Sequence, residues 1–338
     1  MIKKYRLIIP ALAVATAAML AGCGAAAPES STGDGNTSKD DALSIGFFGF
    51  AAANSFAQGV YDGVEEAAEK YGATAEYVDS NFDAQLQAQQ LTDAVTSGQY
   101  DIIIIQANDN LVVQKPIEDA LAAGITVVAE FTPVGPRFDT IEPQVDGIIS
   151  IVDPPVVNGQ GLGEMGLMAC EKVDADPCKV AYMEGFRALP LDNARTKAVV
   201  DTLTEGGAEV VAQVEGGYTA DSGQAAFQDI LTSAPDVNVV IGSSQAVAGA
   251  NLVSGAKNDV QFVGNGASTQ AVDAVRNGDW FATYTLDLKT NGFTAAELGI
   301  KKHQGEDVQE ATAEADLTPS KGIGTAENLE GFEASYSD

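Results

Sequence analysis

Basic residues are scarce in this sequence, and their scarcity limits what the protein can bind. The chain has 18 Lys and Arg against 48 Asp and Glu, which gives a formal net charge of −30 at pH 7. Binding to nucleic acid or to anionic lipid headgroups depends on a cationic surface that neutralises phosphates. The composition therefore excludes a nucleic-acid partner and a basic membrane-binding patch. It does not indicate a cationic ligand, because surface carboxylates mostly serve solubility.

Histidine and the known catalytic motifs are also nearly absent. The one histidine, His303, is expected on a helix beside Lys301 and Lys302, where a solvated side chain is the simplest interpretation. The sequence has no nucleophile elbow, no cluster of metal ligands and no Walker-type phosphate loop. Paired carboxylates are possible among so many acids, but none lies in a recognisable catalytic context. We therefore expect no enzymatic activity, no catalytic residues, no metal and no cofactor.

Cysteine is limited to Cys23, Cys170 and Cys178. The last two flank the expected junction of a helix and a strand, in a connection short enough to be bridged. In an exported protein a disulfide between them is favoured over two buried thiols, and both alternatives stay open. The closed loop would be short, so the bond would act as a local staple with a modest entropic contribution.

The amino-terminal hydrophobic run is too short to form a stable membrane span. It covers residues 7–20, follows a basic segment and is succeeded by small residues, which together indicate a secretory signal over residues 1–22. The residues LAGC at positions 20–23 resemble the bacterial lipobox, which implies that Cys23 is lipidated and becomes the mature amino terminus. We therefore expect export and a lipid anchor on the outer face of the cell membrane, or on its periplasmic side.

Residues 23–42 consist mostly of Ala, Ser, Thr, Gly and Asp and offer almost nothing to bury. We expect a flexible tether there. Removal of the signal takes away three basic residues and no acidic one, so the formal charge of the mature chain becomes −33. The remaining residues, about 300, exceed one ordinary core and indicate two lobes of comparable size.

Residues 43–72 form a unit that the rest of the chain repeats. The apolar run at 43–50 is typical of a buried strand, and Asn54-Ser55 offers helix-capping side chains before a segment of helical periodicity. Strand, loop and capped helix make the first half of a βαβ unit. In open α/β sheets, ligands bind beyond the carboxyl ends of the strands, so residues 51–56 are the first expected part of a binding site.

The same alternation continues along the chain. Further strands are expected at residues 75–78, 101–109, 125–129, 147–152, 180–183, 210–214, 237–241, 261–263 and 280–286. Helices are expected at residues 83–97, 112–123, 156–172, 192–205, 221–233, 245–257, 269–278 and 290–303. The long loop 132–143 separates two series, and the acidic tail after Gly305 has weak periodicity. The pattern predicts an α/β protein of two doubly wound, Rossmann-like lobes with a cleft between them.

Taken in order, these segments resemble the type I periplasmic sugar-binding proteins of ABC importers, the ribose- and galactose-binding kind. The resemblance covers residues 43–305 and rests on the order and spacing of IGFFGFAAANSFAQGVYDGVEEAAEKYG, SNFDAQLQAQQLTDAVTSGQYDIIIIQANDN, ALAAGITVV, GQGLGEMG and FVGNGASTQAVDAVRNGDWFATYT. It implies a monomer of two lobes that encloses a small-molecule ligand and delivers it to an ABC permease.

The family fold also implies three crossovers between the lobes. The N-terminal lobe is expected to comprise residues 43–153 plus 287–312, and the C-terminal lobe residues 154–286 plus the tail 313–338. The crossovers are expected near residues 153–154, near 286–287 and within 309–319.

The resemblance implies ligand contacts position by position. Glu130 keeps the acid of the family's Asp-Arg pair, but Phe131 replaces its arginine. Ser243-Ser244 replaces an Asn-Asp pair, and the segment around Asn265 lacks the family's aspartate, although Asn265 could still reach a hydroxyl. About half of the polar pattern is kept, so a transport role is better supported than ribose as the ligand. The implied ligand-binding residues are Asn54, Phe56, Glu130, Phe131, Arg195, Tyr218, Ser243, Asn265 and Asp287.

These side chains suit a polyhydroxy ligand. A carboxylate accepts and a guanidinium donates hydrogen bonds, so Glu130 and Arg195 could hold neighbouring hydroxyls. Aromatic faces for C–H surfaces are available from Phe47, Phe50, Phe56, Phe131 and Tyr218, although strand alternation favours Phe47 as core and Tyr218 could equally be strand-end packing. The predicted ligand is a small neutral sugar, a polyol or a sugar-like signal such as an autoinducer. A nucleoside is the second alternative.

The expected contacts are divided between the lobes, so a bound ligand should favour the closed state, which the permease would recognise. The sequence does not distinguish this transport role from that of a sensory protein docking on a membrane receptor. Arg195→Ala is expected to weaken binding severely and to leave the fold intact.

Overall fold

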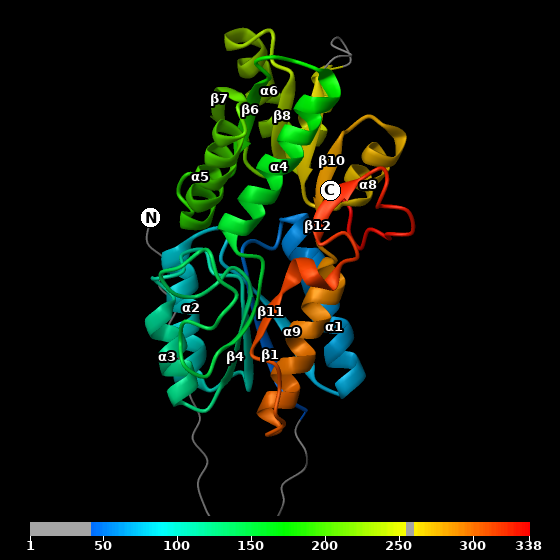
Figure 1. Cartoon of the computed structure of the whole chain (residues 1–338). Helices are drawn as coiled ribbons and strands as arrows, with labels where there is room; N and C mark the ends of the chain where they lie inside the picture. Colours follow the sequence, from blue (N-terminus) through cyan, green and yellow to red (C-terminus); the bar gives the residue numbers. More distant parts are fainter. Residues whose placement is uncertain (1–41, 255–259) are drawn as a thin grey trace, which may run out of the picture. The chain divides into compact units, whose positions relative to one another are not determined.

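The computed structural model describes residues 42–254 and 260–338, and within them the chain builds two six-stranded sheets (Figure 1). The first sheet has the order β11-β5-β4-β3-β1-β2, and all its strands are parallel. The second sheet has the order β12-β10-β9-β8-β6-β7, in which β12 alone is antiparallel to its neighbour. The predicted fold class, two doubly wound lobes, is confirmed. The signal 1–22, Cys23, nearly all of the tether and the last residues of the predicted helix 245–257 lie outside the described residues.

The first lobe contains the sheet and helices of the amino-terminal series together with α9. Its strands are β1 (Ser44–Gly49), β2 (Thr74–Asp79), β3 (Ile102–Ile105), β4 (Thr126–Phe131), β5 (Ile149–Val152) and β11 (Ala311–Ala313). Its helices are α1 (Ser55–Tyr71), α2 (Ala84–Ser97), α3 (Gln114–Ala122) and α9 (Leu288–His303). Helices α1 and α9 cover one face of the sheet and α2 and α3 the other, which explains why every residue of β3 is buried (Figure 1).

The second lobe repeats this arrangement. Its strands are β6 (Lys179–Glu184), β7 (Glu209–Glu215), β8 (Val239–Ser243), β9 (Gln261–Asn265), β10 (Ala282–Thr285) and β12 (Gly322–Thr325). Its helices are α4 (Pro155–Val173), α5 (Pro190–Glu205), α6 (Ala220–Ser233), α7 (Ser244–Ser254) and α8 (Thr269–Asn277). Helices α4 and α5 cover one face, and α6, α7 and α8 cover the other.

The chain passes between the two sheets three times. It leaves the first sheet after β5, returns after β10, and leaves again after β11 through a short 3₁₀ helix, Glu314–Leu317, on its way to β12. The two short strands of the tail, β11 and β12, were not predicted. Each extends one edge of a sheet, so its formation depends on a partner strand rather than on its own periodicity.

Local capping follows the sequence closely. The side chain of Asn54 accepts a hydrogen bond from the backbone N–H of Ala57, as predicted for the start of α1. Helix α9 begins earlier than predicted because Asp287 caps it, accepting from the N–H of Thr290.

In the part of the chain that the structure describes, no helix is long and apolar enough to cross a membrane.

The sulfur atoms of Cys170 and Cys178 lie at bonding distance, 2.04 Å apart. Cys170 is in the last turns of α4 and Cys178 immediately precedes β6. Both side chains are buried in a hydrophobic cluster that also includes residues of the first lobe. Oxidation of this pair in the exported protein stays a prediction.

Candidate ligand-binding site

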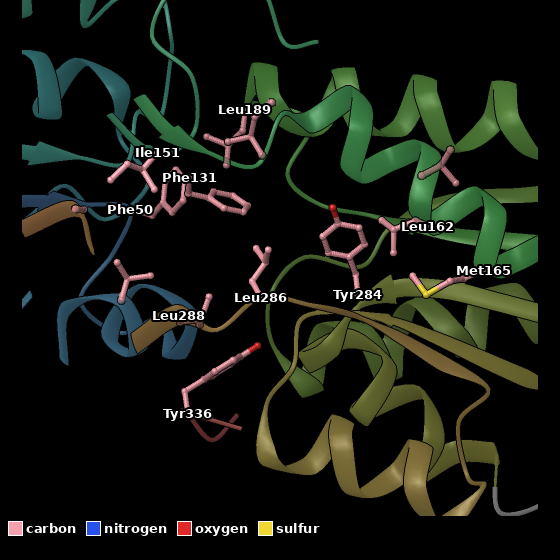
Figure 2. Close-up of a cluster of buried hydrophobic side chains, with 14 of the residues drawn as sticks. Phe50, Phe131, Ile151, Leu162, Met165, Leu189, Tyr284, Leu286, Leu288 and Tyr336 are labelled. Carbon is pink, nitrogen blue, oxygen red and sulfur yellow. The ribbon is translucent and has the colours of Figure 1, made fainter. Parts of the chain in front are cut away.

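A cavity lies where the carboxyl ends of strands from both sheets meet. The volume that the centre of a water molecule can occupy in it is about 50 Å³, and the space between the wall atoms, open solvent included, is about 560 Å³. The first lobe contributes Phe50, Asn54, Phe56, Phe82 and Phe131 to its wall, and the second contributes Leu189, Leu191, Arg195, Tyr218, Gln245, Asn265, Gly266, Tyr284 and Leu286. Figure 2 shows Phe50 and Phe131 on one side of this region, with Tyr284 and Leu286 opposite them. The position is the one that parallel α/β sheets favour for ligands.

Phe131 is held in an unusual backbone conformation at this wall. Its φ is 61°, in the left-handed region that non-glycine residues rarely adopt. Two hydrogen bonds fix it: its N–H donates to Oε1 of Glu314 (2.9 Å), and its carbonyl accepts from the N–H of Asp153 (2.9 Å). Its ring centre lies 4.7 Å from that of Phe56. Such strain persists only where neighbours impose it, and it is concentrated at functional sites.

Phe82, in the loop after β2 of the first lobe, adds another aromatic ring to the cavity wall. Asn81 and Phe82 both have positive φ, 48° and 59°, which turns the loop after β2 toward the cavity. The Phe82 ring is nearly parallel to that of Phe50, at 6.2 Å between centres, and to that of Tyr218, at 6.0 Å. Phe82 thereby connects aromatic side chains of the two lobes.

Arg195 supplies the one charged side chain of the cavity wall among the described residues. It is 3% exposed, and its Nη1 donates to Oδ1 of Asp192 at 2.7 Å. Burial lowers the pKa of the guanidinium, but the oxygens of Tyr218 and Asp192 more than offset this, so the net shift is upward. Its Nε–H is buried and has no acceptor among the described residues. A ligand oxygen could fill that role.

The amide side chains at the wall are partly engaged already. Asn265 exchanges hydrogen bonds with Asn158 of α4, at 3.1 and 3.3 Å. Gln245 donates to the hydroxyl of Ser55 at 3.1 Å, which joins α7 of the second lobe to α1 of the first. The cavity therefore combines aromatic faces with a few fixed donors and acceptors, the usual composition of a small-molecule site.

The structure brings six of the nine predicted contact residues to the cavity wall: Asn54, Phe56, Phe131, Arg195, Tyr218 and Asn265. Phe47 is completely buried in the core, as strand alternation predicted, and Phe50 lines the cavity.

The other three predicted residues do not line the cavity, and their side chains have partners elsewhere. Glu130 is completely buried on β4, where it accepts from Nε2 of Gln106 at 2.8 Å, and it is not among the wall residues. Ser243 donates to the carbonyl of Gly217 at 2.7 Å and accepts from the first turn of α7. Asp287 caps α9, as described above.

Several wall residues were not predicted from the sequence. They are Phe82, Leu189, Leu191, Gln245, Gly266, Tyr284 and Leu286. Gln245 could have been found from its place at the start of a helix that follows a buried strand. Phe82 gave a weaker signal, an aromatic residue in a polar loop, because its direction depends on two left-handed residues.

Three buried carboxyl groups lie behind the wall at the first and third crossings. Burial raises the pKa of Glu130 and of Asp153 to about 7, and that of Glu314 well above its ordinary value. Oε1 of Glu130 and Oε2 of Glu314 have no other partner within the described ranges, and the two side chains interact. A proton shared between them would satisfy both, because a protonated carboxyl donates and a carboxylate accepts. The described residues contain no group of three or more His, Cys, Asp or Glu placed to hold a metal ion.

Comparison with known proteins agrees with this geometry. The family described as periplasmic binding protein domain matches residues 45–307, and the chain therefore belongs to this family, which is one of binding proteins and not of enzymes. No match was found among curated protein sequences.

Solved structures show the same fold. An ABC transporter solute-binding protein from Bacillus halodurans with bound myo-inositol superposes with a TM-score of 0.71 at 21% identity, covering 87% of this chain and 98% of that chain. One from Mycobacterium smegmatis with bound glycerol gives 0.71 at 24% identity, with 88% and 100% covered. One from Actinobacillus succinogenes with bound D-allose gives 0.71 at 16% identity, with 86% and 100% covered.

Proposed function

We propose that this protein is an extracytoplasmic solute-binding lipoprotein that presents a small, uncharged sugar or polyol to an ABC importer. The observation that carries the proposal is the cavity itself, whose wall is drawn from both lobes and combines aromatic faces with amide and guanidinium donors. Apolar ring faces suit the C–H surfaces of a sugar, and the fixed donors suit its hydroxyls.

Family membership and the structural neighbours support this function. The three neighbours described above are ABC transporter solute-binding proteins, and their bound molecules are myo-inositol, glycerol and D-allose. All three are small, uncharged and rich in hydroxyls. The cavity wall of this chain likewise lacks an uncompensated charge, because Arg195 is paired with Asp192.

The division of the wall between two lobes supports a closing mechanism. Asn54, Phe56 and Phe131 belong to the first lobe, whereas Arg195 and Tyr218 belong to the second. A ligand that touches both sets gains part of its contacts only when the lobes meet, so it shifts the population toward the closed form. The closed form is the state that a permease would recognise.

A thermal-shift screen tests the proposed ligand class. The panel comprises monosaccharides, polyols, nucleosides and amino acids. A compound present at about 100 times its dissociation constant should add about 2.7 kcal/mol to the free energy of unfolding. Shifts with sugars or polyols support the proposal, shifts confined to nucleosides support the second alternative, and shifts confined to amino acids contradict a carbohydrate ligand.

A further inference from the structure

Charge in the cavity wall is confined to one residue, and a carboxyl group behind the wall balances it. Arg195 is the one ionisable cation among the wall residues, none of which is an Asp or a Glu. Asp192 is 2% exposed, lies one helical turn earlier on α5 and is not among the wall residues. The arrangement places a buried ion pair at the site with only its positive member facing the ligand.

Asp192 accepts three hydrogen bonds, which fix both its own position and that of its partners. Its Oδ1 accepts from Nη1 of Arg195 at 2.7 Å and from the hydroxyl of Tyr218 at 2.5 Å. Its Oδ2 accepts from the backbone N–H of Phe186 at 2.7 Å. One carboxylate thus orients the cation and an aromatic ring of the wall.

No second cation supplements Arg195 at the described part of this site. Asp153, the next carboxyl group behind the wall, accepts from the hydroxyl of Tyr284 at 2.9 Å and senses the charge of Arg195. Glu314, at the third crossing, interacts with Glu130 of β4. Arg187, which is not among the wall residues, is paired with Glu184.

We propose that Asp192 sets the charge selectivity of the cavity, because it neutralises Arg195 and thereby favours uncharged polyhydroxy ligands over their carboxylate-bearing counterparts. An unpaired guanidinium would bind a carboxylate in two parallel hydrogen bonds. In this chain Nη1 of the guanidinium already donates to a carboxylate of the protein, and the buried Nε–H is left for a hydroxyl or carbonyl oxygen. Asp192 acts through Arg195 and is a positioning residue. The inference rests on the proposed function.

Asp192→Asn tests the inference with the smallest change in shape. The amide oxygen can replace only one of the two carboxylate oxygens, so it keeps either the Tyr218 hydroxyl or the Phe186 N–H as its donor, while the negative charge is lost. Calorimetric titrations would compare D-glucose with D-glucuronate, and D-galactose with D-galacturonate, with myo-inositol as a further uncharged probe. The wild type should bind the uncharged member at least tenfold more tightly than the acid. In Asp192→Asn, the ratio of the affinity for the sugar to the affinity for its acid should shift at least tenfold toward the acid. Asp192→Glu, which keeps the negative charge, should keep the wild-type preference.

The matched control is Asp201→Asn, the same substitution on the same helix in the surface ion pair with Lys197. It should leave the ratio unchanged. If the wild type binds none of the five probes, the proposed function fails. If the wild type binds an uncharged probe but Asp192→Asn keeps its ratio, the inference fails and the proposed function stands. Should Asp192→Asn not fold, as judged by circular dichroism, the wild-type ratio decides: equal affinity for a sugar and its acid would overturn the inference.

Discussion

Among single residues, the pair of Arg195 and Asp192 links the binding site to the stability of the fold. Both side chains are nearly inaccessible to solvent. Breaking a buried ion pair by removing one partner leaves the other charge without compensation and costs about 3–5 kcal/mol. The sequence led us to expect that Arg195→Ala would leave the fold intact. Because the Arg195–Asp192 pair is buried, we now expect the substitution to destabilise the fold as well.

Arg195→Ala should therefore lower the free energy of unfolding by about 3–5 kcal/mol as well as abolish binding. Urea unfolding of the ligand-free protein measures the loss. Arg195→Met combined with Asp192→Asn removes both charges and should be more stable than Arg195→Ala. If Arg195→Ala is as stable as the wild type, the ion pair is not buried as described.

The buried carboxyls give the protein a pH dependence of defined sign. The pKa is raised to about 7 for Glu130 and Asp153, and it is also raised for Glu314, because burial penalises the charged form. The native state therefore keeps protons that the unfolded chain releases near its ordinary pKa of about 4. The stability contributed by protonation is complete below that value and is lost as the pH rises to about 7.

We expect a lower free energy of unfolding at about pH 8 than at about pH 5, measured by urea titration at both. Glu130→Gln should reduce the difference, since an amide stays uncharged and can donate to Glu314. The control Glu142→Gln replaces an exposed acid and should leave the difference unchanged. Equal or greater stability at the higher pH would contradict the shared-proton arrangement.

At the scale of elements, the contact of α1 with α9 positions one side of the cavity. Gly292 of α9 lies so close to α1 that an added Cβ would collide with the carbonyl of Val60, and Gly63 of α1 approaches the backbone of α9 in the same way. Helix α1 begins beside the cavity, with Asn54 as its cap and Phe56 in its first turn. Close packing of these helices therefore holds part of the site.

Gly292→Ala should force the two helices apart and lower the free energy of unfolding by about 1–3 kcal/mol. It should also weaken ligand binding, because α1 carries two wall residues. Thermal unfolding and titration with the best ligand of the screen measure both effects. Thr294→Ala, two residues further along α9, serves as the control. If Gly292→Ala changed neither stability nor ligand binding, the two helices would be free to separate.

Most elements could be predicted because alternating strands and helices have distinct periods and capping residues. The strands β11 and β12 could not, since an edge strand of three or four residues is specified by its partner. Within the site, residues at strand ends such as Phe131 and Asn265 were reachable by topology. Phe82 was not, because its direction depends on left-handed backbone angles. Glu130 accepts from Gln106 and does not line the cavity, whereas the strained residue after it, Phe131, does.

At the scale of the whole molecule, attachment to the membrane remains a prediction from the sequence. The proposed anchor is a lipid on Cys23, followed by a segment of small and polar residues with almost nothing to bury. Cys23→Ser should release the protein from the membrane fraction into the medium or the periplasm. Fractionation and immunoblotting measure this. Unchanged retention of the variant would show that something other than Cys23 holds the protein at the membrane.

The central claim is that a ligand held between the two lobes draws them together. Small-angle X-ray scattering of the wild type tests it most directly, with and without a saturating amount of the uncharged compound that gives the largest thermal shift. The account predicts a smaller radius of gyration in the presence of that compound, because contacts in both lobes are satisfied only in the closed form. An unchanged radius of gyration would be uninformative without proof that the ligand is bound, so binding is verified by calorimetry on the same sample. An unchanged radius with the ligand bound would contradict closure between the lobes.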